Sequence, residues 1–244
     1  MADMLYTVEK ECPVCKKKLP VTKTRGRQKL VRQDSDFCSH FAGDINPYYY
    51  SIWVCPHCGF AAPDSSFENL SAAAEEKLRE FLKGKVVKLD LSGRRSREQA
   101  ITAYKLAIYF GEQFTGLRNS TLAELYLKLG WLYREGGQAA EEAAALDRAR
   151  EYYERALVRE HPPFGNLSAL AVEYLIGELF RRTGRFDEAI AYLGKVVYSP
   201  EAKAEHRLRE MAREAWQAAR QAKASSTASR QESASRESES QLSQ

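Results

Sequence analysis

The sequence contains no apolar run that could cross a membrane, since none reaches the roughly 18–20 residues that a spanning helix needs. Residues 1–11 also lack the apolar core of a secretory signal peptide. Both absences predict a cytoplasmic protein without a membrane partner. In a reducing cytoplasm its five cysteines would stay as thiols, available to a metal ion.

Motifs of the common enzyme classes are missing as well. The chain has no nucleophile elbow, no phosphate-binding loop and no helical pair of metal-binding histidines. An active site requires acids, bases or nucleophiles that converge in space. We therefore expect a protein that is not an enzyme and has no catalytic residues. An enzyme with an unfamiliar site is the least favoured alternative.

Composition and net charge exclude few classes of protein. Apolar residues make up 44% of the chain and charged residues 29%, which is ordinary for a globular protein. A formal net charge of +4 does not distinguish a nucleic-acid-binding protein from one that binds other proteins. The 244 residues are enough for one or two domains, each with its own core.

Four of the cysteines form two Cys-x-x-Cys pairs separated by 39 residues. This spacing lets both sulfurs of a pair lie about 2.3 Å from one metal ion, and the intervening residues leave room for a hairpin or loop. The pattern predicts a zinc-ribbon-like β module. Because a closed four-thiolate site leaves no position for water, the Zn²⁺ is expected to be structural. Its predicted ligands are Cys12, Cys15, Cys55 and Cys58.

Other ligands and other cysteine chemistry are open alternatives at this stage. Cys38, His40 or His57 would each be able to replace one of the four cysteines as a ligand. A structural disulfide would be unusual without an export signal, and a thioredoxin-like thiol needs only one pair beside a βαβ pattern. The sequence favours zinc over both.

The segment 16–32 carries eight basic residues and no acidic one. Clustered cations bind nucleic acid by releasing counterions from its phosphates, which would make Lys16, Lys17, Lys18 and Arg25 the contacts. However, no aromatic residue in the segment is available to stack on a base. We favour a solvated surface and keep nucleic-acid binding by this basic zinc-ribbon face, Lys16–Arg32, as the alternative function.

The rest of the chain predicts helices. Residues 51–54 read as a strand that enters the second cysteine pair, and residues 64–97 as a connecting helix and linker. Residues 98–223 show the small and large apolar spacing of tetratricopeptide-like repeats, followed by a capping helix. About seven extra residues between 136 and 146 must lengthen a helix or a turn. Residues 224–244 are polar and are expected to be disordered.

The combined motifs resemble those of a bacterial family of uncharacterised proteins with a domain of unknown function. The resemblance covers roughly residues 8 to 220 and is carried by residues 12–15, 36–37, 46–49 and 54–61. In that family a cysteine-rich N-terminal segment precedes helices that resemble tetratricopeptide repeats. The resemblance therefore implies a mainly α fold with a small N-terminal zinc-ribbon-like β module, and it implies no activity.

The predicted organisation is a metal-stapled module (1–63), a connector (64–97), a repeat array (98–223) and a tail (224–244). A repeat array offers a concave surface, so the leading hypothesis is a cytoplasmic adaptor or scaffold that binds a protein or peptide partner there. Since these repeats would bury their core against one another, residues 98–223 are expected to fold without the module. The predicted groove residues are Trp131, Tyr174, Glu178, Lys128 and Arg181.

Overall fold

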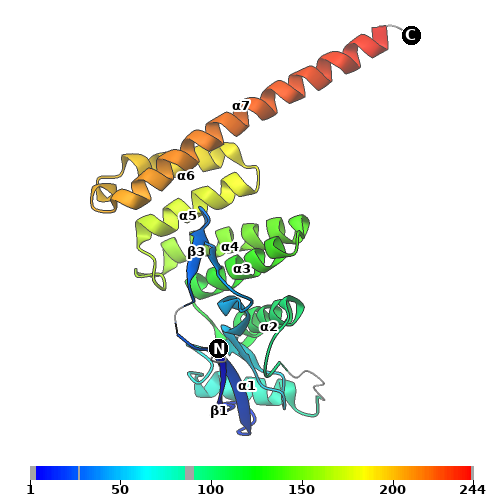
Figure 1. Cartoon of the computed structure of the whole chain (residues 1–244), viewed down its shortest axis with the longest axis vertical. Helices are drawn as coiled ribbons and strands as arrows, with labels where there is room; N and C mark the ends of the chain where they lie inside the picture. Colours follow the sequence, from blue (N-terminus) through cyan, green and yellow to red (C-terminus); the bar gives the residue numbers. More distant parts are fainter. Residues whose placement is uncertain (1–3, 27, 86–90, 243–244) are drawn as a thin grey trace. The chain divides into compact units, whose positions relative to one another are not determined.

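The computed structural model describes residues 4–26, 28–85 and 91–242, with side chains described through Thr227. Over these residues three two-stranded antiparallel sheets come first and seven α-helices follow (Figure 1). The predicted mainly α fold with a small N-terminal β module is therefore confirmed. None of the helices in these ranges combines the length and the apolar character needed to cross a membrane.

The strands form three hairpins in chain order. Each pairs with its neighbour in the sequence, as short connections favour. The first and third hairpins carry the two cysteine pairs in their turns, and the strand predicted at residues 51–54 is found at β5. The hairpins are β1 (Leu5–Glu11) with β2 (Lys18–Thr24), β3 (Leu30–Gln33) with β4 (Ser39–Phe41), and β5 (Ile52–Val54) with β6 (Ala61–Pro63).

The chain divides into two compact units, Met1–Ala156 and Leu157–Gln244. The division predicted from the sequence, after the metal module and its connector, stays a prediction. The first unit joins the β hairpins to α1 (Ala72–Leu82), α2 (Arg97–Phe110), a π-helical turn (Gly111–Thr115), α3 (Asn119–Glu135) and most of α4 (Ala139–Arg159). Residues 86–90, where the sequence predicts part of the linker, lie outside the described residues.

Packing between the β module and α2 explains why these parts form one unit. α2 contacts both β5 and β6, and the rings of Phe60 and Phe110 lie 5.6 Å apart. The buried guanidinium of Arg95, just before α2, donates hydrogen bonds of 2.9 and 2.7 Å to the carbonyls of Tyr49 and Ile52. Because the module covers α2, the expectation that residues 98–223 fold alone finds no support in this arrangement.

Two helical hairpins share one turn geometry, 47 residues apart in the sequence. After α3, Gly137 has a φ of 68°, and the Gln138 amide donates to the Tyr133 carbonyl at 3.0 Å. After α5, Gly184 has a φ of 78°, and the Arg185 amide donates to the Phe180 carbonyl at 2.9 Å. This is a Schellman motif, in which glycine takes the left-handed position that ends a helix. The extra residues predicted in the first hairpin lengthen α4, not the turn.

The second unit consists of helices that pack along one another. α7 contacts α6 through a stripe of buried residues at Leu208, Ala212, Ala215 and Ala219, as expected of a capping helix (Figure 1). Its helices are α5 (Ala169–Arg182), α6 (Phe186–Tyr198), a 3₁₀ turn (Glu201–Lys203) and α7 (His206–Leu242).

Residues 224–244 were expected to be disordered, whereas α7 continues through residues 224–242. Once a helix is nucleated, each further residue adds one hydrogen bond at low entropic cost. Alanine, glutamine, glutamate and arginine, which are frequent in this segment, have high helix propensity. Low hydrophobicity therefore excludes a packed core here but does not exclude a helix.

Close helix packing at Gly177 yields a stability prediction. A Cβ at Gly177 would lie 2.7 Å from Leu193 Cγ and 3.1 Å from the Leu193 amide nitrogen, so backbone would have to move. Overpacking costs about 1–3 kcal/mol, and the higher helix propensity of alanine offsets about 0.5–1 kcal/mol of that cost. Gly177→Ala should therefore destabilise the protein by up to about 2 kcal/mol. Thermal and urea unfolding followed by circular dichroism would measure the change.

Gly194→Ala is the matched control in the same unit. Its Cβ would meet only Trp216 Nε1, at an ordinary 3.5 Å, so the variant should be as stable as the wild type or slightly more stable. Equal destabilisation by the two substitutions would contradict the packing argument.

Candidate metal centre and adjoining pocket

The four predicted ligands lie together. The Sγ atoms of Cys12, Cys15, Cys55 and Cys58 are all within 4.8 Å of one another. Two of these distances, Cys12 to Cys58 and Cys15 to Cys55, are 3.7 Å. In a tetrahedron with metal–sulfur bonds of about 2.3 Å, neighbouring sulfurs lie about 3.8 Å apart. The spacing thus fits a tetrahedral four-thiolate metal site.

Matching turns hold the two cysteine pairs. The amide following each pair, that of Lys16 or Gly59, donates to the carbonyl of the pair's first cysteine, at 2.9 and 2.8 Å respectively. Both positions have positive φ, 58° at Lys16 and 79° at Gly59. Glycine tolerates this conformation, and the permissive role predicted for Gly59 matches its dihedral. Lys16 is not a glycine, so the sequence does not indicate the positive φ at this position.

The buried sulfurs cannot all ionise together without a cation. Hydrogen bonds from Cys12 and Cys58 lower the pKa of the Cys55 thiol. The hydrogen bond with Cys12 raises the pKa of Cys58 far above its usual range. A divalent metal would balance the charge of several thiolates at once, so the arrangement fits a bound ion better than four metal-free thiols.

The three alternative ligands lie away from this cluster. His57 points its Nε2 at the Lys18 carbonyl, 3.0 Å away, and is exposed. Cys38 and His40 belong to a different group around the β3–β4 hairpin, which also contains Asp34. Among the described residues, the first cluster therefore consists of cysteines only.

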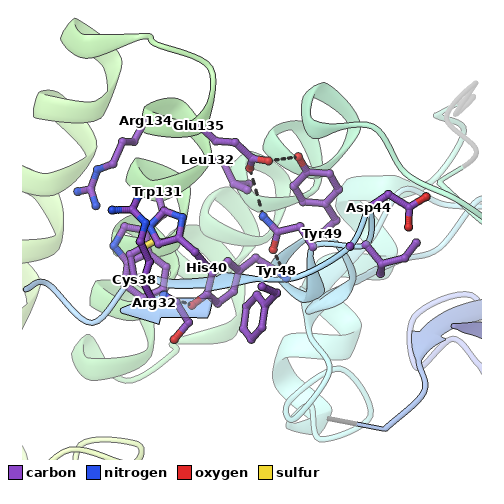
Figure 2. A pocket seen from close by; sticks show the side chains of 15 residues that line it. Arg32, Cys38, His40, Asp44, Tyr48, Tyr49, Trp131, Leu132, Arg134 and Glu135 are labelled. Carbon is purple, nitrogen blue, oxygen red and sulfur yellow. Dashed lines mark hydrogen bonds between the residues drawn. The ribbon is translucent and has the colours of Figure 1, made fainter. Parts of the chain in front are cut away.

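A pocket of about 430 Å³ lies beside this second group. Its walls come from the β3–β4 hairpin, the segment that follows it and the C-terminal half of α3 (Figure 2). The lining residues are Arg32, Cys38, Ser39, His40, Phe41, Gly43, Asp44, Ile45, Asn46, Tyr48, Tyr49, Trp131, Leu132, Arg134 and Glu135. Asn46, Tyr48 and Tyr49 belong to one of the motifs that carry the family resemblance, but the sequence did not predict the pocket, because its walls come from segments about 90 residues apart.

A fully buried carboxylate, Asp36, joins the hairpin to α3. It accepts a hydrogen bond from Trp131 Nε1 at 3.2 Å, and its Oδ2 lies 2.5 Å from an Arg134 nitrogen. Arg134 also donates to Glu142 at 2.7 Å and to Asp34 at 3.2 Å. These bonds set the distance between the two walls of the pocket.

Charged groups occupy both ends of the pocket. At one end Glu135 accepts hydrogen bonds from the Tyr49 hydroxyl at 2.9 Å and from Asn46 at 3.2 Å (Figure 2). At the other end His40 Nε2 lies 2.8 Å from Asp34 Oδ2. Burial alone would raise the pKa of Asp34, but the hydrogen bond and charge of His40, with the nearby arginines, hold it below the ordinary value.

The predicted groove residues are placed differently from the expectation. Trp131 and Tyr174 are 7% and 0% exposed, so neither presents an aromatic anchor at the surface. Trp131 is instead bonded to Asp36 and packs 5.0 Å from the ring of Tyr48. Apolar side chains on a helix lower the free energy more by packing than by facing water, which accounts for their burial.

The charged residues of the predicted groove are engaged with neighbours on their own helices. Glu178 is fully buried and accepts hydrogen bonds from Arg181 at 2.7 Å and Arg182 at 2.9 Å. Lys128 pairs with Glu124 at 2.6 Å. Three of the predicted groove residues, Lys128, Glu178 and Arg181, are therefore paired within their own helices.

Several cations of the basic segment also have partners. Lys18 pairs with Glu9 at 2.6 Å and Lys16 with Glu75 at 3.1 Å. The Arg25 guanidinium lies 5.0 Å from the centre of the Tyr6 ring. The charge excess seen in the linear segment is therefore partly balanced by acidic residues from elsewhere in the chain.

The first site prediction concerns the cysteine cluster. Cys12→Ser or Cys58→Ser should lose one zinc ion per chain relative to the wild type, because a serine hydroxyl cannot replace a thiolate ligand. Elemental analysis of purified protein measures this, and a lower melting temperature should accompany the loss. Cys38→Ser is the control that keeps the four-cysteine ion. Unchanged zinc in both cluster variants would refute the assignment.

The second site prediction concerns Asp36. Asp36→Ala removes one of the three carboxylate partners of Arg134 and leaves the buried Trp131 Nε1–H without its acceptor, so it should cost about 1–3 kcal/mol of unfolding free energy. Asp44→Ala, which removes an exposed pairing with Arg94, should have little effect. Urea unfolding of the two variants compares them directly. An Asp36 variant as stable as the Asp44 variant would show that the buried pair does not join the hairpin to α3.

Comparison with known proteins gives a family and no activity. No curated protein and no solved structure matches the chain. Residues 5–219 match the model of a family described as "Uncharacterized protein conserved in bacteria (DUF2225)". This match spans the β hairpins, the cysteine cluster, the pocket and the helices as far as α7. The chain therefore belongs to the DUF2225 family of uncharacterised bacterial proteins.

Proposed function

We propose that this protein is a zinc-stabilised adaptor that binds a protein or peptide segment in the pocket between the β3–β4 hairpin and α3. The observation that carries the proposal is the pocket of about 430 Å³ next to an exposed apolar strand. Its volume lies in the range of roughly 300–1,000 Å³ that is typical of ligand sites. The binding surface moves from the predicted helical groove to this pocket.

Strand β3 supplies the apolar part of the surface. Leu30 and Val31 are 51% and 64% exposed, which is unusual for two adjacent large apolar residues. Over the described residues β3 pairs only with β4. An exposed edge strand of this kind accepts an extended segment of a partner through backbone hydrogen bonds.

The pocket supplies polar specificity. Tyr48 and Phe41 form an aromatic wall with ring centres 5.8 Å apart. Glu135 can pair with a basic partner residue, while Asp44 and Arg32 can exchange their exposed pairings with Arg94 and Asp34 for charges of the partner. A peptide that alternates apolar and charged side chains matches this distribution.

The metal supports the fold under this proposal. We assign Zn²⁺ to the four cysteines because a thiolate-only tetrahedral donor set suits zinc. With all four positions taken by protein, the ion has no site for a substrate, so its role is structural. Reduced thiols of this kind persist in a reducing compartment, which supports a cytoplasmic location.

We also assign the helical hairpins α3–α4 and α5–α6 to the tetratricopeptide-like class. Their shared turn geometry supports this, and so do equivalent close contacts at Gly130 and Gly177. A Cβ on either would lie 2.8 or 2.7 Å from the leucine sixteen residues later, Leu146 or Leu193. Small residues at such contacts let the paired helices approach closely, as in repeat proteins.

Nucleic-acid binding by the basic face is the weaker alternative. Lys16 and Lys18 pair with carboxylates, so phosphate contacts would compete with existing ion pairs. The Arg25 guanidinium already lies 5.0 Å from the centre of the Tyr6 ring, so that ring face is not free to stack on a base. An enzymatic role has no support beyond the pocket itself.

Site-specific photo-crosslinking in native cell extract tests the proposal. A photo-reactive amino acid at Val31 should give discrete crosslinks to protein, and Arg32→Ala in the same chain should weaken them several-fold. The same amino acid at Val158, which is 84% exposed, is the matched control and should give none of these bands. Gel mobility and mass spectrometry would identify the products.

Two results would contradict the proposal. Identical crosslinks from positions 31 and 158 would indicate non-specific capture. Crosslinks from position 31 that nuclease removes, with a yield that falls steeply with salt, would favour the nucleic-acid alternative.

A further inference from the structure

The β3–β4 hairpin brings three metal-binding side chains together outside the four-cysteine cluster. Asp34 follows β3, Cys38 precedes β4, and His40 lies within β4. Cys38 and His40 are two residues apart and project from the same face of the strand. The Asp34 amide donates to the Cys38 carbonyl at 2.8 Å, which closes the hairpin turn. One carboxylate oxygen, one sulfur and one ring nitrogen lie within 4.8 Å of one another.

We propose that Asp34, Cys38 and His40 form a second metal site, which takes a divalent transition metal such as Zn²⁺. Carboxylate, thiolate and imidazole together form a donor set that suits zinc and its neighbours in the first transition row, and does not suit Mg²⁺ or Ca²⁺. Three protein ligands leave one position of a tetrahedron open. This distinguishes the site from the closed four-cysteine cluster.

The distances require only a small adjustment on binding. His40 Nε2 and Asp34 Oδ2 lie 2.8 Å apart, whereas ligands at about 2.0–2.1 Å from a tetrahedral ion are about 3.3–3.4 Å apart. Opening the pair by roughly half an ångström is within the reach of side-chain rotation. Cys38 is 5% exposed, so the sulfur side of a bound ion would be shielded from water.

The local charge favours a cation despite two nearby arginines. Three carboxylates, on Asp34, Asp36 and Glu142, are in contact with the guanidinium groups of Arg32 and Arg134. With His40 neutral, as a metal ligand must be, the group carries one surplus negative charge, and ionisation of Cys38 adds another. Arg134 keeps Asp36 and Glu142 as partners if Asp34 turns to a metal. A divalent ion therefore neutralises the group and leaves no buried cation unpaired.

The open coordination position of the proposed metal ion faces the pocket. Cys38 and His40 both line the 430 Å³ pocket, so a ligand in the pocket would reach the ion (Figure 2). Water, a carboxylate or an imidazole is the chemistry that such an ion binds. The inference does not rest on the adaptor proposal, because it concerns the ion and this chain alone.

Cobalt titration of the full-length, metal-free protein under reducing conditions is the test. Co²⁺ reports on its ligands, since a four-thiolate site gives intense sulfur-to-cobalt absorption and a site with one thiolate gives much weaker absorption. The wild type should bind two equivalents with these two signatures. Cys38→Ser and His40→Ala should each bind one equivalent, with the four-thiolate spectrum intact.

His161→Ala is the matched histidine control and should bind two equivalents, because His161 lies in a loop outside both clusters. The intact four-thiolate spectrum also reports that a variant is folded. Should Cys38→Ser or His40→Ala lose that spectrum, Asp34→Asn, which keeps the side-chain size, replaces it and should bind one equivalent.

A wild type that binds a single equivalent would overturn the proposal and leave Asp34 and His40 as an ion pair of the hairpin. So would a second equivalent that persists unchanged in the variants at residues 34, 38 and 40. Neither result bears on the adaptor function, because no partner is present in the titration.

Discussion

The buried contact of Asp36 with Arg134 and Trp131 is the interaction on which the N-terminal unit depends. A carboxylate without solvent exposure is stable only when charged and polar groups surround it, and here both come from α3. The contact joins a short hairpin, whose strands bury no apolar side chain completely, to the helical part of the chain. It thereby creates the pocket, whose two walls it holds in place.

The cysteine pairs and the helices could be predicted because their signals are local. The spacing of Cys12, Cys15, Cys55 and Cys58 implies a shared ion whatever lies between the pairs, and the four sulfurs do come together. Helix positions followed from apolar periodicity and from glycines such as Gly184. The prediction was weakest where helix propensity and low hydrophobicity conflict, as in residues 224–242.

The pocket and its hairpin could not be predicted, because their contacts are long-range. Two of the three carboxylate partners of Arg134, Asp34 and Asp36, lie about 100 residues earlier in the chain. Trp131 on α3 was expected to face a binding partner and instead packs against Tyr48. Periodicity indicates that a residue lies on an apolar face but not which element covers that face.

The placement of the four cysteines along the chain has a consequence for how the pocket forms. Residues 32–49, which supply one of its walls, lie between Cys15 and Cys55. An ion held by both cysteine pairs closes this segment into a loop and removes much of the entropy it would otherwise lose on ordering. Under the proposed function, the supply of metal would thereby determine how many copies of the protein are competent to bind in the pocket. Metal depletion would then reduce binding without any change to the pocket residues.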